Sequence, residues 1–140
     1  MSRVFWDTNL FIYLFEGSGA LSKQVANLRS RMLSRGDQLL TSTMTLGEVL
    51  VKPIQSGDSK TADYYQKLIT TTAVLLPFEE KAAVVYARLR TDKSLRPPDA
   101  IQLACAASVG VDLFVTNDIH LHSRQIPGIR FITPLERLPI

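Results

Sequence analysis

The sequence has a single cysteine, no long apolar run and no low-complexity stretch. Cys105 has no second cysteine with which to form an intramolecular disulfide, and this favours a reducing, cytoplasmic setting. The apolar stretches, such as residues 104–107, are far shorter than the roughly 20 residues that a membrane-spanning helix needs. The first residues reach Asp7 too early to provide the apolar segment of a signal peptide. We therefore expect a protein without disulfides, signal peptide or membrane anchor.

The composition is that of an ordinary globular protein. Of 140 residues, 46% are apolar and 21% are charged, which is enough to build a hydrophobic core. No repeat or linker divides the chain, so we expect one domain spanning residues 1–140. If four of the 13 acidic residues form a site, nine remain against 16 lysines and arginines. Such a basic body would attract polyanions, although ordinary solubilising charge explains the balance equally well.

Short apolar runs alternate with longer helical patterns along the chain. This alternation indicates an α/β fold, with a parallel sheet covered by helices on both faces. Near-continuous apolar strands agree, because strands buried on both faces need not alternate with polar residues. The expected strands are Val4–Trp6, Gln38–Thr41, Ala73–Leu76, Leu113–Thr116 and Arg130–Ile132, and the expected helices are Asn9–Phe15, Leu21–Ser34, Met44–Val51, Ser59–Thr71, Phe78–Thr91 and Pro98–Val109.

Four carboxylates are expected close to the ligand site of such a sheet. In open α/β sheets the ligand site lies beyond the carboxyl ends of the strands. Asp7 directly follows the first expected strand, and Asp118 follows the fourth. Glu48 lies in the helix after the second strand, and Asp99 lies in the first turn of the last expected helix. Carboxylates brought together at one edge repel one another, and Mg²⁺, a hard cation that prefers oxygen ligands, would relieve that repulsion.

Each of these acids also has an ordinary structural explanation. Asp7 suits a helix N-cap, Asp118 suits a turn, and Asp99 gains from the helix dipole. Glu48 is harder to explain in this way, because its neighbours are apolar and a carboxylate near an apolar face needs a partner. A thiolate site is not indicated, because Cys105 lies within an apolar run. The prediction of a site therefore depends on the set of acids and not on any one of them.

At these residues the chain resembles the PIN-domain nucleases, and more narrowly the toxins of VapBC-type toxin–antitoxin pairs. The motifs occur in the order and spacing of that family, essentially from the first residues to the last. One Asp-Thr-Asn triplet would be weak, but four motifs in register are specific. The four stretches that carry the acids are Val4–Asn9, Thr45–Leu50, Arg96–Ala104 and Leu113–Asp118, and a fifth matching stretch, Ile126–Ile132, follows them.

The resemblance implies a PIN-like three-layer α/β/α sandwich with a five-stranded parallel sheet. It implies an endoribonuclease that uses Mg²⁺, or Mn²⁺ as a substitute, to hydrolyse RNA phosphodiester bonds. At the matching positions, Asp7 and Asp99 would be direct metal ligands, while Glu48 and Asp118 would act directly or through water. Thr116 would be the polar residue that the family places beside the acids. The resemblance also implies a cytoplasmic toxin that forms a homodimer and is held inactive by a small antitoxin protein.

Basic residues are candidates for contacts with the RNA phosphates. One group leads into the Asp99 motif and the other lies in the second expected helix; both are explained equally well by solvated helix faces. Exposed aromatic residues could stack on unpaired bases, but this role is not assigned to Trp6, Phe11, Tyr13 and Phe15, because they are expected in the core. The two groups are Arg88, Arg90, Lys93 and Arg96, and Arg29, Arg31 and Arg35.

Two other functions remain open. A phosphatase of the haloacid-dehalogenase type also places an Asp after the first strand, but it would need a second acid where this chain has Asn9. It would also need a lysine near the later acids, and none lies between Arg96 and Arg124. The other alternative is a catalytically silent PIN-fold module that binds RNA or protein, and the four intact acids argue against it.

Overall fold

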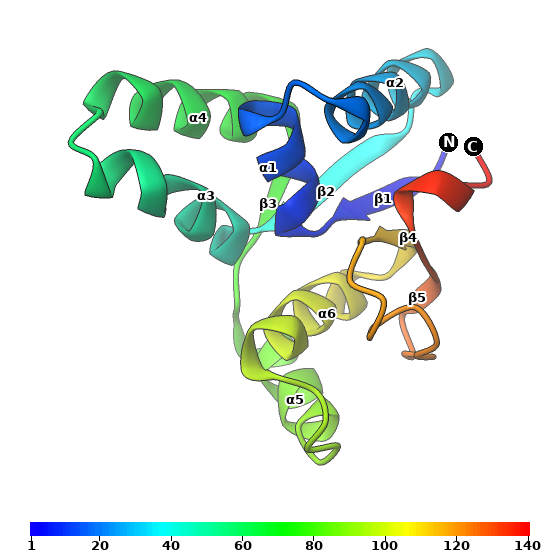
Figure 1. Ribbon diagram of the computed structural model, residues 1–140. Helices are drawn as coiled ribbons and strands as arrows, with labels where there is room; N and C mark the ends of the chain where they lie inside the picture. The colour runs from blue at the N-terminus through cyan, green and yellow to red at the C-terminus, as the bar shows by residue number, and fades with distance from the viewer.

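Five parallel strands form one sheet in the computed structural model, which describes residues 1–140 (Figure 1). The strand order is β3-β2-β1-β4-β5, and every neighbouring pair is parallel. The expected α/β fold with a five-stranded parallel sheet is therefore confirmed. The strands are β1 (Arg3–Trp6), β2 (Gln38–Ser42), β3 (Val74–Leu76), β4 (Val111–Val115) and β5 (Ile129–Thr133).

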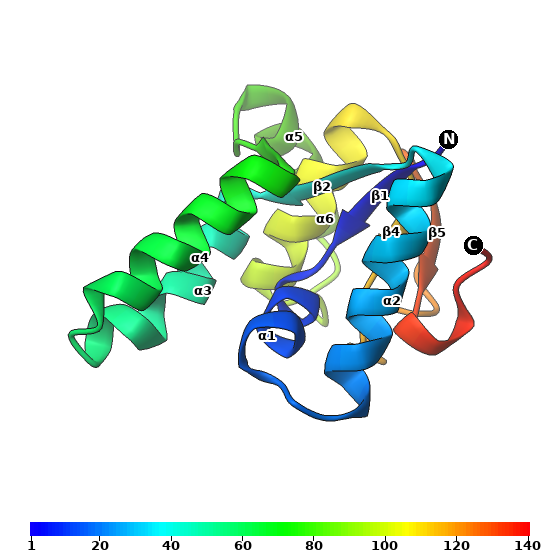
Figure 2. The same cartoon turned by 90° about the horizontal axis from the view of Figure 1, so that it is seen from above.

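Helices cover both faces of this sheet. Four lie on one face, and the α3–α4 pair extends sideways beyond the strands (Figure 2). Two lie on the opposite face (Figure 1). None of the helices is both long enough and apolar enough to cross a lipid bilayer. The first four helices are α1 (Thr8–Glu16), α2 (Ala20–Arg35), α3 (Thr43–Gln55) and α4 (Ser59–Thr72); the other two are α5 (Glu80–Leu89) and α6 (Pro97–Val109), and a short 3-10 helix η1 (Leu135–Arg137) follows β5.

The core consists of two apolar clusters, one on each face of the sheet. Phe5 of β1 stacks on Phe114 of β4 at 4.9 Å between ring centroids, on the face covered by α5 and α6. Val4 and Trp6, the residues on either side of Phe5, pack against the other helices. Because β1 is buried on both faces, its apolar run is continuous. Cys105 is also fully buried, and burial raises the pKa of its thiol to about 11.

Most element boundaries lie within two residues of the expected ones, and the largest difference is at the end of α3. Helix α3 continues to Gln55, past the expected end at Val51, with Pro53 in its last turn. Strand β4 begins at Val111, before the expected start at Leu113. The side chain of Asp112 accepts the backbone N–H of Arg3 at 2.8 Å, which ties a polar position of β4 to the start of β1.

Gly128→Ala is expected to destabilise the protein by about 2–4 kcal/mol, lowering Tm by roughly 8–15 °C. Gly128 has φ +98°, and a Cβ there would lie 2.5 Å from the carbonyl oxygen of Ala107 at the end of α6. Gly57 is a matched control, since its φ is +71° but a Cβ would meet nothing within 4 Å. Thermal melts should show a clearly smaller loss for Gly57→Ala; equal losses would mean that the contact with Ala107 is unimportant.

Candidate active site

The polar residues after β1 and β4 lie where the strand order reverses. The chain passes from β1 to β2 on one side of β1, whereas β4 adjoins its other side. A crevice at such a switch point is the usual ligand site of an open α/β sheet. The Asp7 N–H donates to the carbonyl of Val115 at 3.0 Å, and the Thr116 N–H donates to the carbonyl of Thr133 at 3.1 Å. These bonds continue the sheet and fix Asp7 and Thr116 at its edge.

Asp7 is a buried carboxylate, only 8% exposed. Its Oδ1 accepts the N–H of Thr8 at 2.8 Å, so it does cap α1, as the ordinary explanation proposed. Its Oδ2 accepts the hydroxyl of Thr116 at 2.7 Å. Burial raises the pKa of Asp7 above its ordinary value, and the charges of Asp99 and Glu48 raise it further, against the hydrogen bonds from Thr116 and Thr8 that lower it. The structure thus places three carboxylates within electrostatic reach of one another.

Glu48 reaches this group from α3 through a threonine. Its Oε1 accepts the hydroxyl of Thr8 at 2.7 Å, and Thr8 also donates its N–H to Asp7. Glu48 is exposed, and the Thr8 hydroxyl is the hydrogen-bond partner that its carboxylate was expected to need.

Asp99 and Asp118 lie on the other side of the crevice and share one arginine. Each side chain is 19% exposed. Arg96 Nε lies 3.4 Å from Asp99 Oδ2, and Arg96 Nη2 lies 3.8 Å from Asp118 Oδ2. The Asp118 N–H donates to the Thr116 hydroxyl oxygen at 3.1 Å. Thr116 therefore connects Asp118 to Asp7 and closes a chain of contacts through all four acids.

The oxygen atoms of the four acids fit a divalent cation that keeps several of its bound waters. No three Asp, Glu, His or Cys side chains lie close enough together to hold a metal ion. The four acids are linked instead through the hydroxyls of Thr8 and Thr116 and the guanidinium of Arg96. Mg²⁺ accepts such a site, because it prefers oxygen and keeps several waters beside one or two carboxylates. The residues suit a cation bound largely through water, and not one enclosed by four carboxylates.

Gln102 belongs to this site and is absent from the sequence prediction. It is 3% exposed, and its Nε2 donates to the hydroxyls of Thr45 at 2.7 Å and Thr8 at 2.9 Å. Its Oε1 accepts the hydroxyl of Ser42. The amide thus joins the ends of β1 and β2 through α6. Its spacing of three residues from Asp99, which places both on one face of α6, is the feature that could have indicated it.

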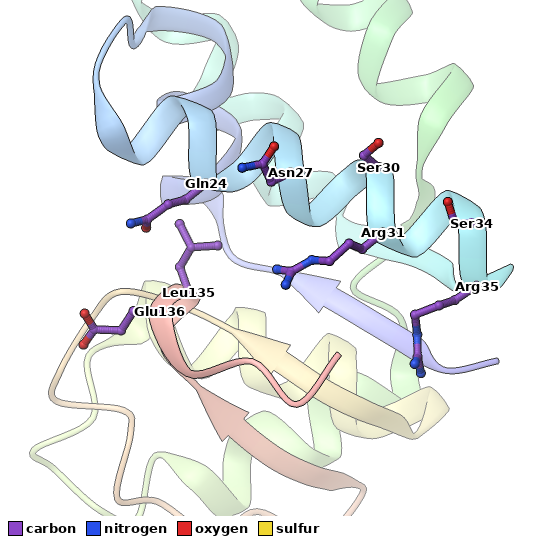
Figure 3. Close-up of a pocket in the computed structure, with 8 residues that line it drawn as sticks. All are labelled: Gln24, Asn27, Ser30, Arg31, Ser34, Arg35, Leu135 and Glu136. Carbon is purple, nitrogen blue, oxygen red and sulfur yellow. The ribbon is translucent and has the colours of Figure 1, made fainter.

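The basic residues predicted to contact RNA are dispersed. Arg96 lies at the acids, but Arg90 donates to the carbonyl of Leu95 at 2.6 Å. Arg31 and Arg35 line a cavity of about 720 Å³ between α2 and η1 (Figure 3), and Arg35 pairs with Asp37 at 2.9 Å. None of the four acids lines that cavity. Arg31 and Arg35 therefore lie at a cavity separate from the four acids.

Comparisons with known proteins agree with this architecture. The PIN domain family model matches residues 4–125. The fold is similar to a chain of VapBC2 from Rickettsia felis bound to a promoter DNA fragment, with TM-score 0.76 and 18% identity over 94% of this chain and 98% of that one. It is also similar to a chain of DNA-bound VapBC from Salmonella typhimurium, with TM-score 0.75 and 22% identity over 96% and 99%. It is similar as well to a chain of VapBC-1 from nontypeable Haemophilus influenzae, with TM-score 0.71 and 18% identity over 96% of this chain and 99% of that one. No curated protein matches the sequence significantly.

Proposed function

Because the chain belongs to the PIN domain family, we propose that it is an endoribonuclease that hydrolyses RNA phosphodiester bonds with the help of a divalent cation. The single observation that supports this most is that Asp99 and Glu48 lie near enough to the buried carboxylate of Asp7 to raise its pKa, while Asp118 is joined to Asp7 through Thr116. An arrangement of like charges is unfavourable in an isolated protein, and a bound cation offsets it.

Asp7 and Asp99 would hold Mg²⁺ or Mn²⁺ directly, and Glu48 and Asp118 would complete the site directly or through water. When bound, such a cation would lower the pKa of an attacking water and offset negative charge on the phosphate. Thr116 orients Asp7 through its 2.7 Å hydrogen bond. Glu48, the most accessible of the acids, would accept a proton from the attacking water, since its carboxylate is both fixed by Thr8 and open to solvent.

The biological role would be that of the toxin in a type II toxin–antitoxin pair. Support comes from the fold, which is similar to chains of three VapBC complexes over more than nine-tenths of each chain. On this proposal residues 1–140 act as one nuclease domain in the cytoplasm, form a homodimer and bind a small antitoxin protein. Co-purification with the product of a short adjacent reading frame would test the partner.

Asp99→Asn is expected to reduce RNA cleavage by roughly two orders of magnitude, because it removes a charged ligand of the cation. Purified protein should cut RNA with Mg²⁺ or Mn²⁺, leave 5′-phosphate and 3′-hydroxyl ends, and stop when EDTA is added. Asp63→Asn is a matched control, because Asp63 is an exposed acid on α4 with no ion pair, and it should keep wild-type activity. Cleavage that persists in EDTA or in Asp99→Asn would contradict the proposal.

A further inference from the structure

Two cavities that share one lining residue, Arg124, lie at Asp99 and along the outer strand of the sheet. A cavity of about 340 Å³ adjoins Asp99 and is lined also by Arg96, His120 and Arg124. A second cavity, of about 560 Å³, lies along β5 beyond Arg124, and Arg124 lines both. We call the second cavity the edge groove; the residues that matter in it are His122, Arg124, Arg130 and Phe131. The edge groove thus shares one lining residue, Arg124, with the cavity at Asp99.

The edge groove is basic and contains no carboxylate. Its charged lining residues are Arg124 and Arg130, and no aspartate or glutamate is among its lining residues. Arg124 is held in place by Asp92 at 2.8 Å and by the hydroxyl of Ser94 at 3.1 Å. Arg130 has no ion pair with any acid. Arg130 is therefore the unpaired cation of the groove and can contact a phosphate, whereas the charge of Arg124 is offset by Asp92.

Phe131 is exposed at the edge of the sheet, beside the free arginine. Its strand, β5, pairs only with β4, and Phe131 is 56% exposed. The guanidinium carbon of Arg130 lies 5.6 Å from the centroid of the Phe131 ring. An exposed aromatic ring next to a free cation is the combination on which unpaired bases stack in single-stranded nucleic-acid sites. A duplex would not offer its base faces to such a ring.

We propose that the edge groove binds a single-stranded segment of the RNA that runs through the active site, with Arg130 contacting a phosphate and Phe131 stacking on an unpaired base. This inference rests on the proposed function, since it assumes that RNA occupies the crevice at Asp99. RNA is favoured over a protein strand that would add to the β5 edge because no acid lines the groove, Arg130 has no ion pair, and the cavity at Asp99 shares Arg124 with the groove.

The test is binding of a short fluorescently labelled single-stranded RNA to the full chain in EDTA, measured by anisotropy so that no cleavage is needed. Phe131→Ala should weaken binding about tenfold, the loss typical of one stacked base, and Phe131→Trp should retain it. Arg130→Gln should reduce the slope of log K against log salt by about 0.7, the value for one phosphate contact on a single strand. Tyr64→Ala is the control, because Tyr64 is 62% exposed on α4, away from the groove, and it should bind like wild type.

The inference would be overturned if Phe131→Ala bound the single-stranded RNA as tightly as wild type. It would also be overturned if Phe131 bound duplex RNA or a protein partner while the single strand did not bind. Thermal melts of Phe131→Ala should match wild type, since the side chain is largely in solvent. If RNA binding depends on Phe131 but cleavage needs no metal, the result supports binding in the edge groove and contradicts the proposed metal-dependent nuclease. If the protein cleaves RNA with a metal but does not bind the single strand, the result supports the nuclease and contradicts binding in the edge groove.

Discussion

Asp7→Asn is expected to lower Mg²⁺-dependent RNA cleavage by roughly two to three orders of magnitude while leaving the protein folded. In EDTA at neutral pH its Tm should equal or exceed that of wild type by up to about 5 °C, since 1 kcal/mol corresponds to a few degrees in a chain of this size. The reason is that burial, Asp99 and Glu48 all raise the pKa of Asp7. The charged carboxylate of Asp7 therefore destabilises the folded state at neutral pH.

The sign of the pH dependence follows from that shift. Because the pKa of Asp7 is higher in the folded than in the unfolded chain, its contribution to stability is fully present below the ordinary value of 3.8. That contribution is lost as the pH rises through the raised value. The excess stability of Asp7→Asn over wild type should therefore be seen at neutral pH and should shrink as the pH falls toward 4. Melts across this range in EDTA measure it.

Mg²⁺ adds an independent measurement on the same pair of proteins. Wild type should gain thermal stability as Mg²⁺ is added, because a ligand that binds only the folded state stabilises it, and Asp7→Asn should gain much less. Asp63→Asn serves as the charge-matched control and should follow wild type in both respects. If Asp7→Asn melts well below wild type in EDTA, Asp7 is mainly an N-cap that needs its charge. If it cleaves normally, the assigned site is wrong.

Gln102→Ala is expected to destabilise the protein by about 2–3 kcal/mol and to reduce cleavage by roughly 10- to 100-fold. Gln102 is fully enclosed, and its amide is hydrogen bonded to the hydroxyls of Ser42, Thr45 and Thr8. Truncation would leave these hydroxyls without their partner and let Thr8 move, and with it Asp7. Chemical denaturation measures the first effect and initial rates measure the second.

The Mg²⁺ requirement separates a positioning role of Gln102 from a purely structural one. If Gln102 positions Asp7 through Thr8, Gln102→Ala should need more Mg²⁺ for half-maximal cleavage, even well below its melting temperature. Gln66→Ala on the exposed side of α4 is the control and should be neutral in both assays. An unchanged Mg²⁺ requirement would mean that Gln102 holds the core together and no more.

Predictions from the sequence were most successful where the determining interactions are local. The run Val4–Trp6 forms β1 and Asp7 caps the helix that follows it, because both depend on residues adjacent in the chain. For Glu48 the sequence left the surroundings open. On a helix adjacent residues point in different directions, and only the packing of α3 decides that Val49 is buried while Glu48 is exposed.

The sequence by itself determined the alternation of strands and helices, the family of the chain and the acids that are candidates for the site. These features follow from periodicity and from motifs that neighbouring residues define. Only the tertiary structure decided that Gln102 is enclosed among three hydroxyls and that Phe131 lies on an open edge. The physical reason is that the sequence of a strand such as Ile129–Thr133 does not indicate whether the strand lies at the centre or at the edge of a sheet. Its exposure is set by the strand order, which depends on contacts between segments far apart in the chain.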